Sequence, residues 1–311
     1  MIRILCTCPP MIRAIESLKG EFSKHNAEVF CPEFQQTLSV PELLDLVPQY
    51  DGWIIGDDPA TAEVFSAGKN GRLRAAIKWG AGTDNVDFSG AAALGFDVEN
   101  TPGTFGEEVS DVALAYLIGL ARHLFLIDRH VRAGNWPKPA GRSLQNKIVG
   151  IVGYGHIGQA LRRKVEAIGM SPIIYDPAEN PSWKSDLPIA IWPDRLDELD
   201  FLVLACALTP ANRHLINSNS LLKMKKGVMI INVARGALID QEALRAALDA
   251  RHVSAAALEV LEEEPPEKNE ALLSYENCVF GSHNSSNAVE AVYRTSMLAI
   301  QLLFRKLGLN K

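Results

Sequence analysis

The stretch Ile148-Val149-Gly150-Ile151-Val152-Gly153-Tyr154-Gly155-His156-Ile157-Gly158 joins a short apolar run to glycines in the pattern G-x-G-x-x-G. The apolar run predicts a buried strand. Apolar residues at helical spacing follow it, namely Ile157, Leu161, Val165 and Ile168. A second apolar run then ends at Asp176. Three glycines alone are a weak signal, but strand, glycine turn, helix and strand in this order predict a parallel unit that binds a dinucleotide.

The residue types in this stretch suit a pyrophosphate. Gly153 permits a tight turn, Gly155 lets the backbone approach the phosphates, and Gly158 lets the helix pack closely on the strand. The first helical amides, from His156 and Ile157, favour a negative charge together with the helix dipole. A purely structural glycine turn is the less favoured alternative, because the flanking strands and helix all fit. We therefore expect these five residues to hold a cofactor.

Asp176 indicates which dinucleotide is bound. Its carboxylate can accept hydrogen bonds from the adenosine ribose hydroxyls, and it would repel a 2′-phosphate. The next residues, Pro177 and Ala178, offer no cation to such a phosphate. The sequence therefore predicts NAD rather than NADP.

Short apolar strands alternate with helical patterns along the whole chain, which predicts an α/β fold with parallel sheets. In the first part the expected strands are residues 2–6, 27–30, 52–55, 75–79 and 96–99. In the second part they are residues 148–152, 172–175, 201–205, 228–233, 255–261 and 279–281. Each part has the elements of a complete doubly wound unit, so we expect two such domains.

The segment between the two parts reads as a helix. Thr104 and Glu107 fit a capping box at its start. Apolar residues then recur at spacings of three and four from Val109 to Ile127, which predicts one long helix. It should end before the helix breakers in residues 133–137.

The last helical pattern, near residues 287–306, follows the final strand and has nothing of its own to pack on. We therefore expect it to return to the first domain. The predicted organisation is a discontinuous domain of residues 1–100 plus 287–311, and a second domain of residues 101–286.

The composition excludes several classes of protein. The 311 residues are 47% apolar and 22% charged, which is typical of a folded soluble chain and not of a disordered or collagen-like one. The formal net charge of −6 leaves no basic footprint for nucleic acid. The longest apolar run, residues 112–121, is too short to span a bilayer, and the start lacks a signal-peptide pattern. We expect no nucleic-acid or membrane partner.

The cysteines are Cys6, Cys8, Cys31, Cys206 and Cys278. An odd number, sparsely placed, predicts free thiols in a reducing compartment and hence a cytoplasmic protein. A metal could bind Cys6 and Cys8, but no second cysteine or histidine pair has ligand spacing. Small apolar side chains near a strand end are the favoured interpretation, and no metal is expected.

Three polar residues follow successive predicted strands of the second domain. Arg235 comes after strand 228–233, Glu264 after strand 255–261, and His283 after strand 279–281. Singly, each has a simpler structural explanation. The neighbouring acids Glu262 and Glu263 are expected to be a solvated face. Because ligands of parallel sheets bind at the carboxyl ends of the strands, the three together behind a dinucleotide loop predict a catalytic site.

At this point the sequence resembles the D-isomer-specific 2-hydroxyacid dehydrogenases along nearly the whole chain. The stretches that carry the resemblance are Gly80-Ala81-Gly82-Thr83-Asp84-Asn85-Val86-Asp87, Asn100-Thr101-Pro102-Gly103, residues 150–158, residues 232–236 and Glu264-Pro265. The resemblance implies a flavodoxin-like substrate domain and a Rossmann NAD-binding domain with a cleft between them. It also implies a homodimer formed through the nucleotide domain, with the helix after Gly106 and the arm around Trp136 in the contact.

The resemblance also implies roles for individual residues. Arg235 would bind the substrate carboxylate, and His283 would be the general acid in reduction, hydrogen-bonded to Glu264. Amides of Ala81 and Gly82 would complete the carboxylate site, and Ala234 and Glu259 would lie at the cofactor. The chemistry agrees, since carbonyl reduction needs a proton donor at the oxygen and arginine offers a planar fork to a carboxylate.

Departures from the family pattern concern cofactor and substrate. Glu259 stands where the family commonly has an aspartate that meets the nicotinamide carboxamide, and Ser282 stands where a proline is usual. Asp57 and Asp58 follow strand 52–55, where phosphoglycerate dehydrogenases often carry an arginine for the phosphate. Two acids would repel a phosphate, although Lys78 or Arg74 could compensate. An unphosphorylated acid is therefore favoured over 3-phosphoglycerate.

The predicted function is NAD-dependent interconversion of a small D-2-hydroxy acid and its 2-oxo acid. The alternative is an NAD-binding corepressor, since relatives of this kind exist and can keep the same three residues. Oxidation of formate or phosphite is a weaker alternative, because it needs no acid–base pair at a hydroxyl group.

Overall fold

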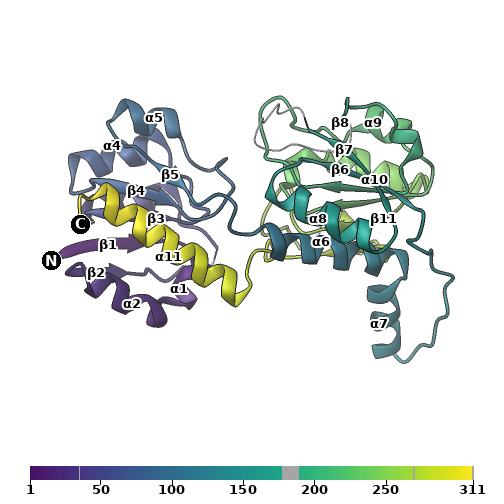
Figure 1. Ribbon diagram of the computed structural model, residues 1–311, viewed down its shortest axis with the longest axis horizontal. Helices are drawn as coiled ribbons and strands as arrows, with labels where there is room; N and C mark the ends of the chain where they lie inside the picture. The colour runs from purple at the N-terminus through teal and green to yellow at the C-terminus, as the bar shows by residue number, and fades with distance from the viewer. Residues whose placement is uncertain (35, 177–188, 269, 310–311) are drawn as a thin grey trace. The chain divides into compact units, whose positions relative to one another are not determined.

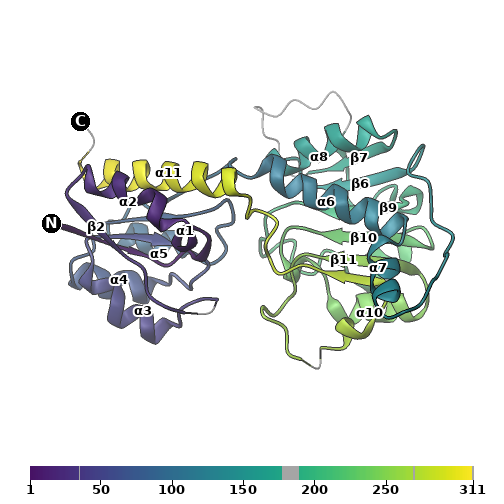
Figure 2. The ribbon, with the colours of Figure 1, turned by 90° about the horizontal axis from the view of Figure 1, so that it is seen from below.

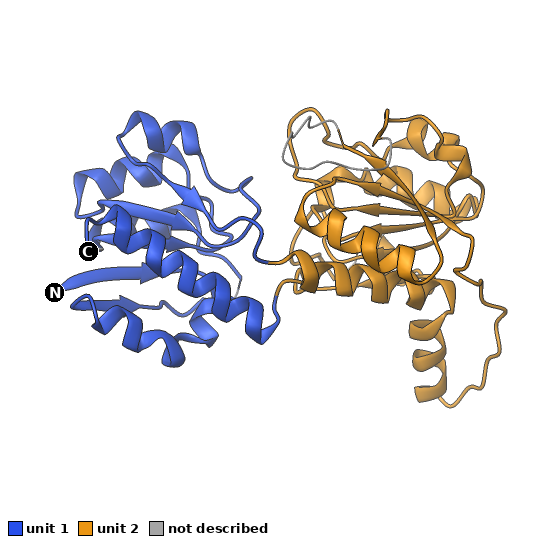
Figure 3. Cartoon of the chain, viewed as in Figure 1, with its two compact units in different colours: residues 1–104, 287–311 blue, residues 105–286 orange. Residues whose placement is uncertain are grey.

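The computed structural model describes residues 1–34, 36–176, 189–268 and 270–309. It divides the chain into two compact units: Met1–Thr104 with Asn287–Lys311 (unit 1), and Phe105–Ser286 (unit 2) (Figure 3). The first boundary lies four residues beyond the one expected from the sequence. The last helix, α11 (Val289–Lys306), belongs to unit 1, where it packs against strands β3 and β4.

Unit 1 is built on a five-stranded parallel sheet in the order β2-β1-β3-β4-β5. This is the flavodoxin-like order of doubly wound sheets. The strands are β1 (Ile2–Cys6), β2 (Ala27–Phe30), β3 (Gly52–Ile55), β4 (Ala75–Lys78) and β5 (Glu99–Asn100). Figure 2 shows α1 (Pro9–Arg13), α2 (Ile15–Ser23) and α11 on one face, with α3 (Val40–Leu46) and α4 (Ala62–Asn70) on the other. A short helix, α5 (Phe88–Ala93), packs against α4.

Unit 2 is built on a seven-stranded parallel sheet in the order β12-β11-β10-β9-β6-β7-β8. The order reverses between β6 and β9, as in a Rossmann fold. The strands are β6 (Ile148–Val152), β7 (Ser171–Tyr175), β8 (Ile189–Ala190), β9 (Phe201–Leu204), β10 (Val228–Asn232), β11 (Val253–Leu258) and β12 (Cys278–Phe280). The helices are α6 (Gly106–Ala121), α7 (Leu124–Arg132), α8 (His156–Ala167), α9 (Ser218–Lys223) and α10 (Gln241–Asp249) (Figure 1). The α/β fold of two doubly wound parallel sheets is therefore confirmed.

The single long helix expected from the sequence is wrong. Helices α6 and α7 are bent by 69° at His123, whose φ of 55° is left-handed. The Phe125 ring folds back onto Gly119, where an added Cβ would lie 2.1 Å from the ring. None of the described helices is by itself long and apolar enough to cross a membrane.

The capping box expected at the start of α6 is also wrong. The residue that precedes the helix is Phe105, which makes no side-chain capping bond. The Thr104 hydroxyl instead donates to the carbonyl of Thr101, at 3.2 Å.

An aspartate precedes a central strand in each unit and ties it to the next strand. Asp51 comes directly before β3, and its Oδ2 accepts the backbone N–H of Arg3 on β1 at 2.9 Å. Asp200 comes directly before β9, and its Oδ2 accepts the N–H of Ile148 on β6 at 3.1 Å. Both carboxylates lie at the amino edges of their sheets.

Candidate active site

The glycine loop lies at the point where the strand order of unit 2 reverses. Gly153 follows β6 with a φ of 98°, and a Cβ placed there would lie 2.7 Å from the backbone of Cys206, which follows β9. A Cβ at Gly158 would lie 2.0 Å from the carbonyl oxygen of Gly153. Only glycine at these two positions lets α8 sit directly on the turn.

Helix α8 begins at this loop. Gly155 is its N-cap, without a side-chain capping bond, and the exposed His156 and half-buried Ile157 are its first two residues. The positive end of a twelve-residue helix dipole thus faces the loop. Asp176 lies at the same place, since its Oδ2 accepts the N–H of Tyr154 at 2.5 Å. These features fit the pyrophosphate and ribose of a dinucleotide.

Two residues that entered the NAD prediction, Pro177 and Ala178, lie outside the described residues. Among the described residues, the NAD prediction therefore rests on Asp176 and the glycine loop.

The turn that carries Arg235 follows β10, and hydrogen bonds from the buried Asn232 side chain stabilise it. The buried Asn232 donates from Nδ2 to the carbonyl of Arg235 at 2.8 Å, and its Oδ1 accepts the N–H of Ala234 at 3.0 Å. Arg235 Nη1 donates to the Ala234 carbonyl at 2.8 Å. A Cβ at Gly236 would lie 1.9 Å from the backbone of Leu261, so this turn packs on the segment after β11. Ala234 is buried, and its N–H and carbonyl are both bonded within the turn.

His283 and Glu264 form a close pair. His283 Nδ1 and Glu264 Oε2 are 2.7 Å apart, and the side chains are 26% and 28% exposed. Glu264 Oε1 accepts the N–H of Leu261 at 3.0 Å, which fixes the carboxylate. With an ionised carboxylate as acceptor, Nδ1 carries the proton of this bond, and the pair favours the imidazolium form of the histidine.

Glu259 follows β11 and bonds to residues of two other segments. Its side chain is buried, and Oε1 accepts the backbone N–H of Asn284 at 2.5 Å. Oε2 accepts the hydroxyl of Tyr116, which comes from α6. Burial, together with this bond, raises the pKa of Tyr116. Tyr116 lies within the apolar pattern from Val109 to Ile127, and that periodicity gives no signal of a polar role.

Glu262 is exposed, as expected for a solvated face, and it also forms surface ion pairs. Its Oε1 lies 2.5 Å from His214 Nε2 and 3.5 Å from Arg213 Nη2. Glu263 is exposed, as expected.

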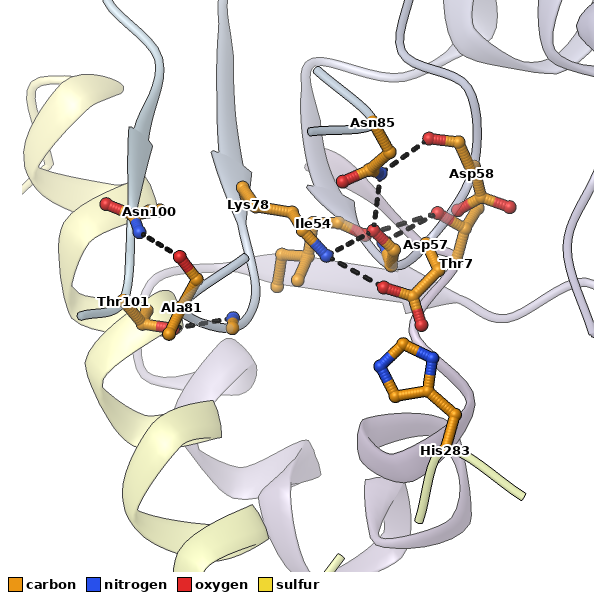
Figure 4. Close-up of polar contacts among 12 residues, drawn as sticks. Thr7, Ile54, Asp57, Asp58, Lys78, Ala81, Asn85, Asn100, Thr101 and His283 are labelled. Atoms are coloured by element: carbon orange, nitrogen blue, oxygen red, sulfur yellow. Dashed lines mark hydrogen bonds and ion pairs between the residues drawn. The ribbon is translucent and has the colours of Figure 1, made fainter. Parts of the chain in front are cut away.

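The carboxyl edge of the unit 1 sheet carries the loop of Ala81 and Gly82 (Figure 4). Gly80 has a φ of 114° and donates from its N–H to Thr101 Oγ1 at 2.7 Å, while Asn100 Nδ2 donates to the Ala81 carbonyl at 3.1 Å. Within the part of the chain that the structure describes, the N–H groups of Ala81 and Gly82 have no protein acceptor. They therefore suit an anionic oxygen.

The two acids after β3 do not act as the repelling pair that the sequence suggested (Figure 4). Asp58 is fully buried and accepts the N–H of Leu38 at 2.8 Å, and burial raises its pKa. Asp57 is exposed, but Lys78 Nζ donates to its Oδ1 at 3.1 Å and to the Gly56 carbonyl at 2.7 Å. The Asp57 charge is therefore offset.

Comparison with known proteins agrees with this architecture. Residues 114–285 match the family model described as the D-isomer specific 2-hydroxyacid dehydrogenase, NAD binding domain. The chain is 37% identical over 279 residues to the hydroxypyruvate reductase of Thermotoga maritima, covering 88% of this chain and 90% of that protein. It is 35% identical over 260 residues to the glyoxylate reductase of Korarchaeum cryptofilum, covering 81% and 78% of the two chains.

Solved structures give the same result for the fold. A crystal structure of a Thermus thermophilus protein superposes with a TM-score of 0.85 at 30% identity, covering 99% of this chain and 97% of that one. The glyoxylate reductase of Paecilomyes thermophila gives a TM-score of 0.82 at 27% identity, with 98% and 95% covered. The chain belongs to the D-isomer-specific 2-hydroxyacid dehydrogenases, NAD-dependent enzymes that interconvert 2-hydroxy acids and 2-oxo acids.

Proposed function

We propose that this enzyme reduces a small, unphosphorylated 2-oxo acid such as hydroxypyruvate or glyoxylate, with His283 as the proton donor and Arg235 as the carboxylate-binding residue. The observation that carries the proposal is the His283–Glu264 pair, 2.7 Å apart, in the unit that also holds the glycine loop. Two similar proteins named above as a hydroxypyruvate reductase and a glyoxylate reductase support the substrate class.

His283 supplies the proton that the carbonyl oxygen needs as the carbon is reduced. Glu264 accepts from Nδ1, so the proton given to substrate comes from Nε2, and Glu264 stabilises the charged ring before transfer. NADH, when bound, would supply the hydride. A positioned acid of this kind contributes about a hundred- to ten-thousand-fold in rate.

Arg235 in unit 2, and separately the Ala81 and Gly82 loop in unit 1, offer donors that suit a carboxylate. The guanidinium is always charged and can bind two carboxylate oxygens at once. Asn232 bonds the Arg235 turn on two sides, so the arginine starts from an ordered backbone. The N–H groups of Ala81 and Gly82 are further donors for the same chemical group.

The preference for an unphosphorylated acid rests on paired cations. Lys78 is buried and bonded to Asp57 and the Gly56 carbonyl. Arg74 lies at the opposite edge of the sheet, with Nε 3.8 Å from an Asp51 oxygen. Neither of the cations that the sequence offered for a phosphate is therefore well placed to bind one. The preference for an unphosphorylated acid therefore rests on the placement of Lys78 and Arg74, and not on charge repulsion by Asp57 and Asp58.

The glycine loop and Asp176 would hold NAD. The amides of His156 and Ile157 would receive the pyrophosphate, with Gly153, Gly155 and Gly158 allowing its approach. The Asp176 carboxylate would bind the ribose hydroxyls and disfavour a 2′-phosphate.

We also propose a homodimer that forms through α7 and the segment after it. Of the described residues of α7, none is buried, and Leu124, Val131 and Trp136 are 51%, 41% and 78% exposed. A second copy would cover this apolar surface. Sedimentation velocity should give twice the chain mass, and Trp136→Ser should shift the protein toward monomer. A wild-type monomer at micromolar concentration would contradict the proposal.

A reducing, cytoplasmic location is supported by the cysteines. All five are free, and Cys6, Cys8 and Cys278 are buried.

The test of function is the loss of NADH absorbance with glyoxylate, hydroxypyruvate, 3-phosphohydroxypyruvate and pyruvate, using Arg235→Ala as the blank. We expect rapid turnover of an unphosphorylated acid. A clear preference for the phosphorylated acid would show that the protein is a dehydrogenase but would contradict the proposed unphosphorylated substrate. Bound NADH without turnover of any acid would favour the corepressor alternative.

A further inference from the structure

The buried side chains of Tyr116 and Glu259 meet at the half-buried Gly281, next to the segment that carries His283. Tyr116 lies in α6, whereas Glu259 directly follows β11 and Gly281 directly follows β12. We propose that Glu259 and Tyr116 are positioning residues that hold the backbone of His283 in its working conformation. This inference rests on the role of His283 in the proposed function.

The first support is that one residue bonds two successive amides. The Glu259 carbonyl accepts the N–H of His283 at 2.9 Å, and its Oε1 accepts the N–H of Asn284 at 2.5 Å. His283 has a φ of 54°, a left-handed conformation that is unfavourable for a residue with a side chain. Such a conformation persists only where the surroundings impose it, and here Glu259 binds the chain on both sides of the turn.

The second support is the way in which the Glu259 carboxyl group is held. The side chain is buried, so its oxygens need hydrogen-bond donors. The Tyr116 hydroxyl donates to Oε2, and the Tyr116 side chain is itself buried. Oε1 is thereby fixed toward Asn284. The tyrosine thus acts on His283 through Glu259.

The third support is a glycine that makes room for this pair. A Cβ at Gly281 would lie 1.8 Å from Glu259 Oε2 and 2.6 Å from the Tyr116 hydroxyl. Its backbone is not left-handed, so space rather than φ requires glycine here. The hydrogen bond between Glu259 and Tyr116 therefore requires a glycine at position 281.

The competing role for Glu259 is contact with the nicotinamide, as the family resemblance implies. The two roles differ in what they change. A cofactor contact would alter NADH affinity, whereas a positioning residue would alter kcat and leave NADH binding nearly intact.

The test compares Tyr116→Phe and Glu259→Gln with a matched control, Tyr275→Phe. Tyr275 also donates its hydroxyl to a carboxylate, Asp249 Oδ1 at 2.7 Å, but it precedes β12 at the opposite end from His283. We expect Tyr116→Phe to lower kcat about tenfold, since the loss of this hydrogen bond loosens the Glu259 side chain and only part of the effect reaches His283. NADH affinity, followed by fluorescence, should stay within about twofold. Tyr275→Phe should change neither quantity.

A second readout does not depend on turnover. The pH titration of the His283 ring proton signal, identified by its loss in His283→Gln, can be followed by NMR without substrate. We expect Tyr116→Phe and Glu259→Gln to lower its midpoint, because a displaced ring makes a weaker bond to Glu264. Tyr275→Phe should leave the midpoint in place.

The outcomes separate the two proposals. A shifted His283 signal with no turnover of any acid by the wild type would support positioning and overturn the proposed function. An active wild type whose kcat and His283 signal are unchanged by both substitutions would overturn positioning alone. Weaker NADH binding with unchanged kcat would assign Glu259 to the cofactor instead.

Discussion

Asp51 in unit 1 and Asp200 in unit 2 hold their sheets in the same way. Each takes a backbone N–H from the neighbouring strand and pairs with a cation, Arg72 Nη2 at 2.9 Å for Asp51 and Lys225 Nζ at 2.8 Å for Asp200. The two sheets differ in strand order, but each has a buried aspartate at its amino edge that joins two neighbouring strands.

The carboxyl edges of the two sheets differ. Unit 2 presents a glycine turn, the start of a helix and the residues Arg235, Glu264 and His283. Unit 1 presents a left-handed glycine, two amides and a buried lysine bonded to Asp57. We therefore infer that the amino edges serve stability, whereas the carboxyl edges carry the residues proposed to bind ligands, as expected for open parallel sheets. Substitutions at the two edges should separate activity from stability.

The largest effect is expected for His283→Gln. Losing the proton donor should lower kcat by about a hundred- to ten-thousand-fold, with little change in the free energy of unfolding. The control is His252→Gln at the amino edge, where Nε2 lies 2.8 Å from the Leu221 carbonyl. His252→Gln should lower stability and leave kcat unchanged. Steady-state rates with denaturant unfolding of both variants check this, and full activity of His283→Gln would remove its assigned role.

Arg235→Lys should follow in size. Lysine keeps the charge but cannot bind a carboxylate through two nitrogen donors, so kcat/KM should fall about ten- to a hundredfold. Arg72→Lys, the same change at the amino edge, should leave kcat/KM unchanged. If both variants have wild-type kcat/KM, Arg235 does not bind the substrate carboxylate.

The elements that were predicted well from the sequence are those whose signal is local. Strands β3 and β6 begin and end as expected, because each is a continuous apolar run that is nearly completely buried. The two-residue strands β5 and β8 carry too few apolar residues to give such a run: β5 lies later than the strand expected at 96–99, and β8 was missed. The bend at His123 depends on the Phe125 ring meeting Gly119, which apolar periodicity does not report.

The candidate site divides in the same way. The packing of Gly158 on Gly153 could be predicted, because the two residues are close in sequence as well as in space. The contact of Gly153 with Cys206 joins residues that are far apart in sequence. Tyr116 and Glu259 are 143 residues apart, and their contact forms only when α6 packs on the sheet. A single sequence gives no sign of such a pair.

Lowering the pH should weaken the contacts that Asp51 and Asp200 make at the amino edges of the two sheets. Burial alone would raise the pKa of Asp200, but the N–H of Ile148 and the Lys225 ammonium outweigh it, so the pKa is lowered on folding. The same balance lowers the pKa of Asp51, through Arg3 and Arg72. A lowered folded-state pKa adds stability above the unfolded value of about 3.9, and that stability is lost as pH falls through the folded value.

Asp200→Asn and Asp51→Asn should each therefore lower the free energy of unfolding by about 1.5–3 kcal/mol at pH 7. The gap to wild type should shrink toward pH 3. Urea unfolding across this range measures it, with kcat at pH 7 expected to stay at the wild-type value. A gap that does not change with pH would show that the two carboxylates act only as neutral acceptors.

The smallest effect on function is expected for substitutions of Asp176. This residue lies at the carboxyl edge of the unit 2 sheet, and it also bonds to the backbone of the glycine loop. Its Oδ2 accepts the N–H of Tyr154, so Asp176→Ala removes both the charge and an acceptor of the loop, whereas Asp176→Asn removes the charge and keeps an acceptor. If the charge excludes a 2′-phosphate, both variants should narrow the preference for NADH over NADPH by about tenfold, and only the alanine should also weaken both cofactors. Dissociation constants for the two cofactors measure this, with Glu166→Ala on α8 as a control acid that pairs with Arg162. An unchanged ratio in Asp176→Asn would mean that the carboxylate orders the glycine loop and does not select the cofactor.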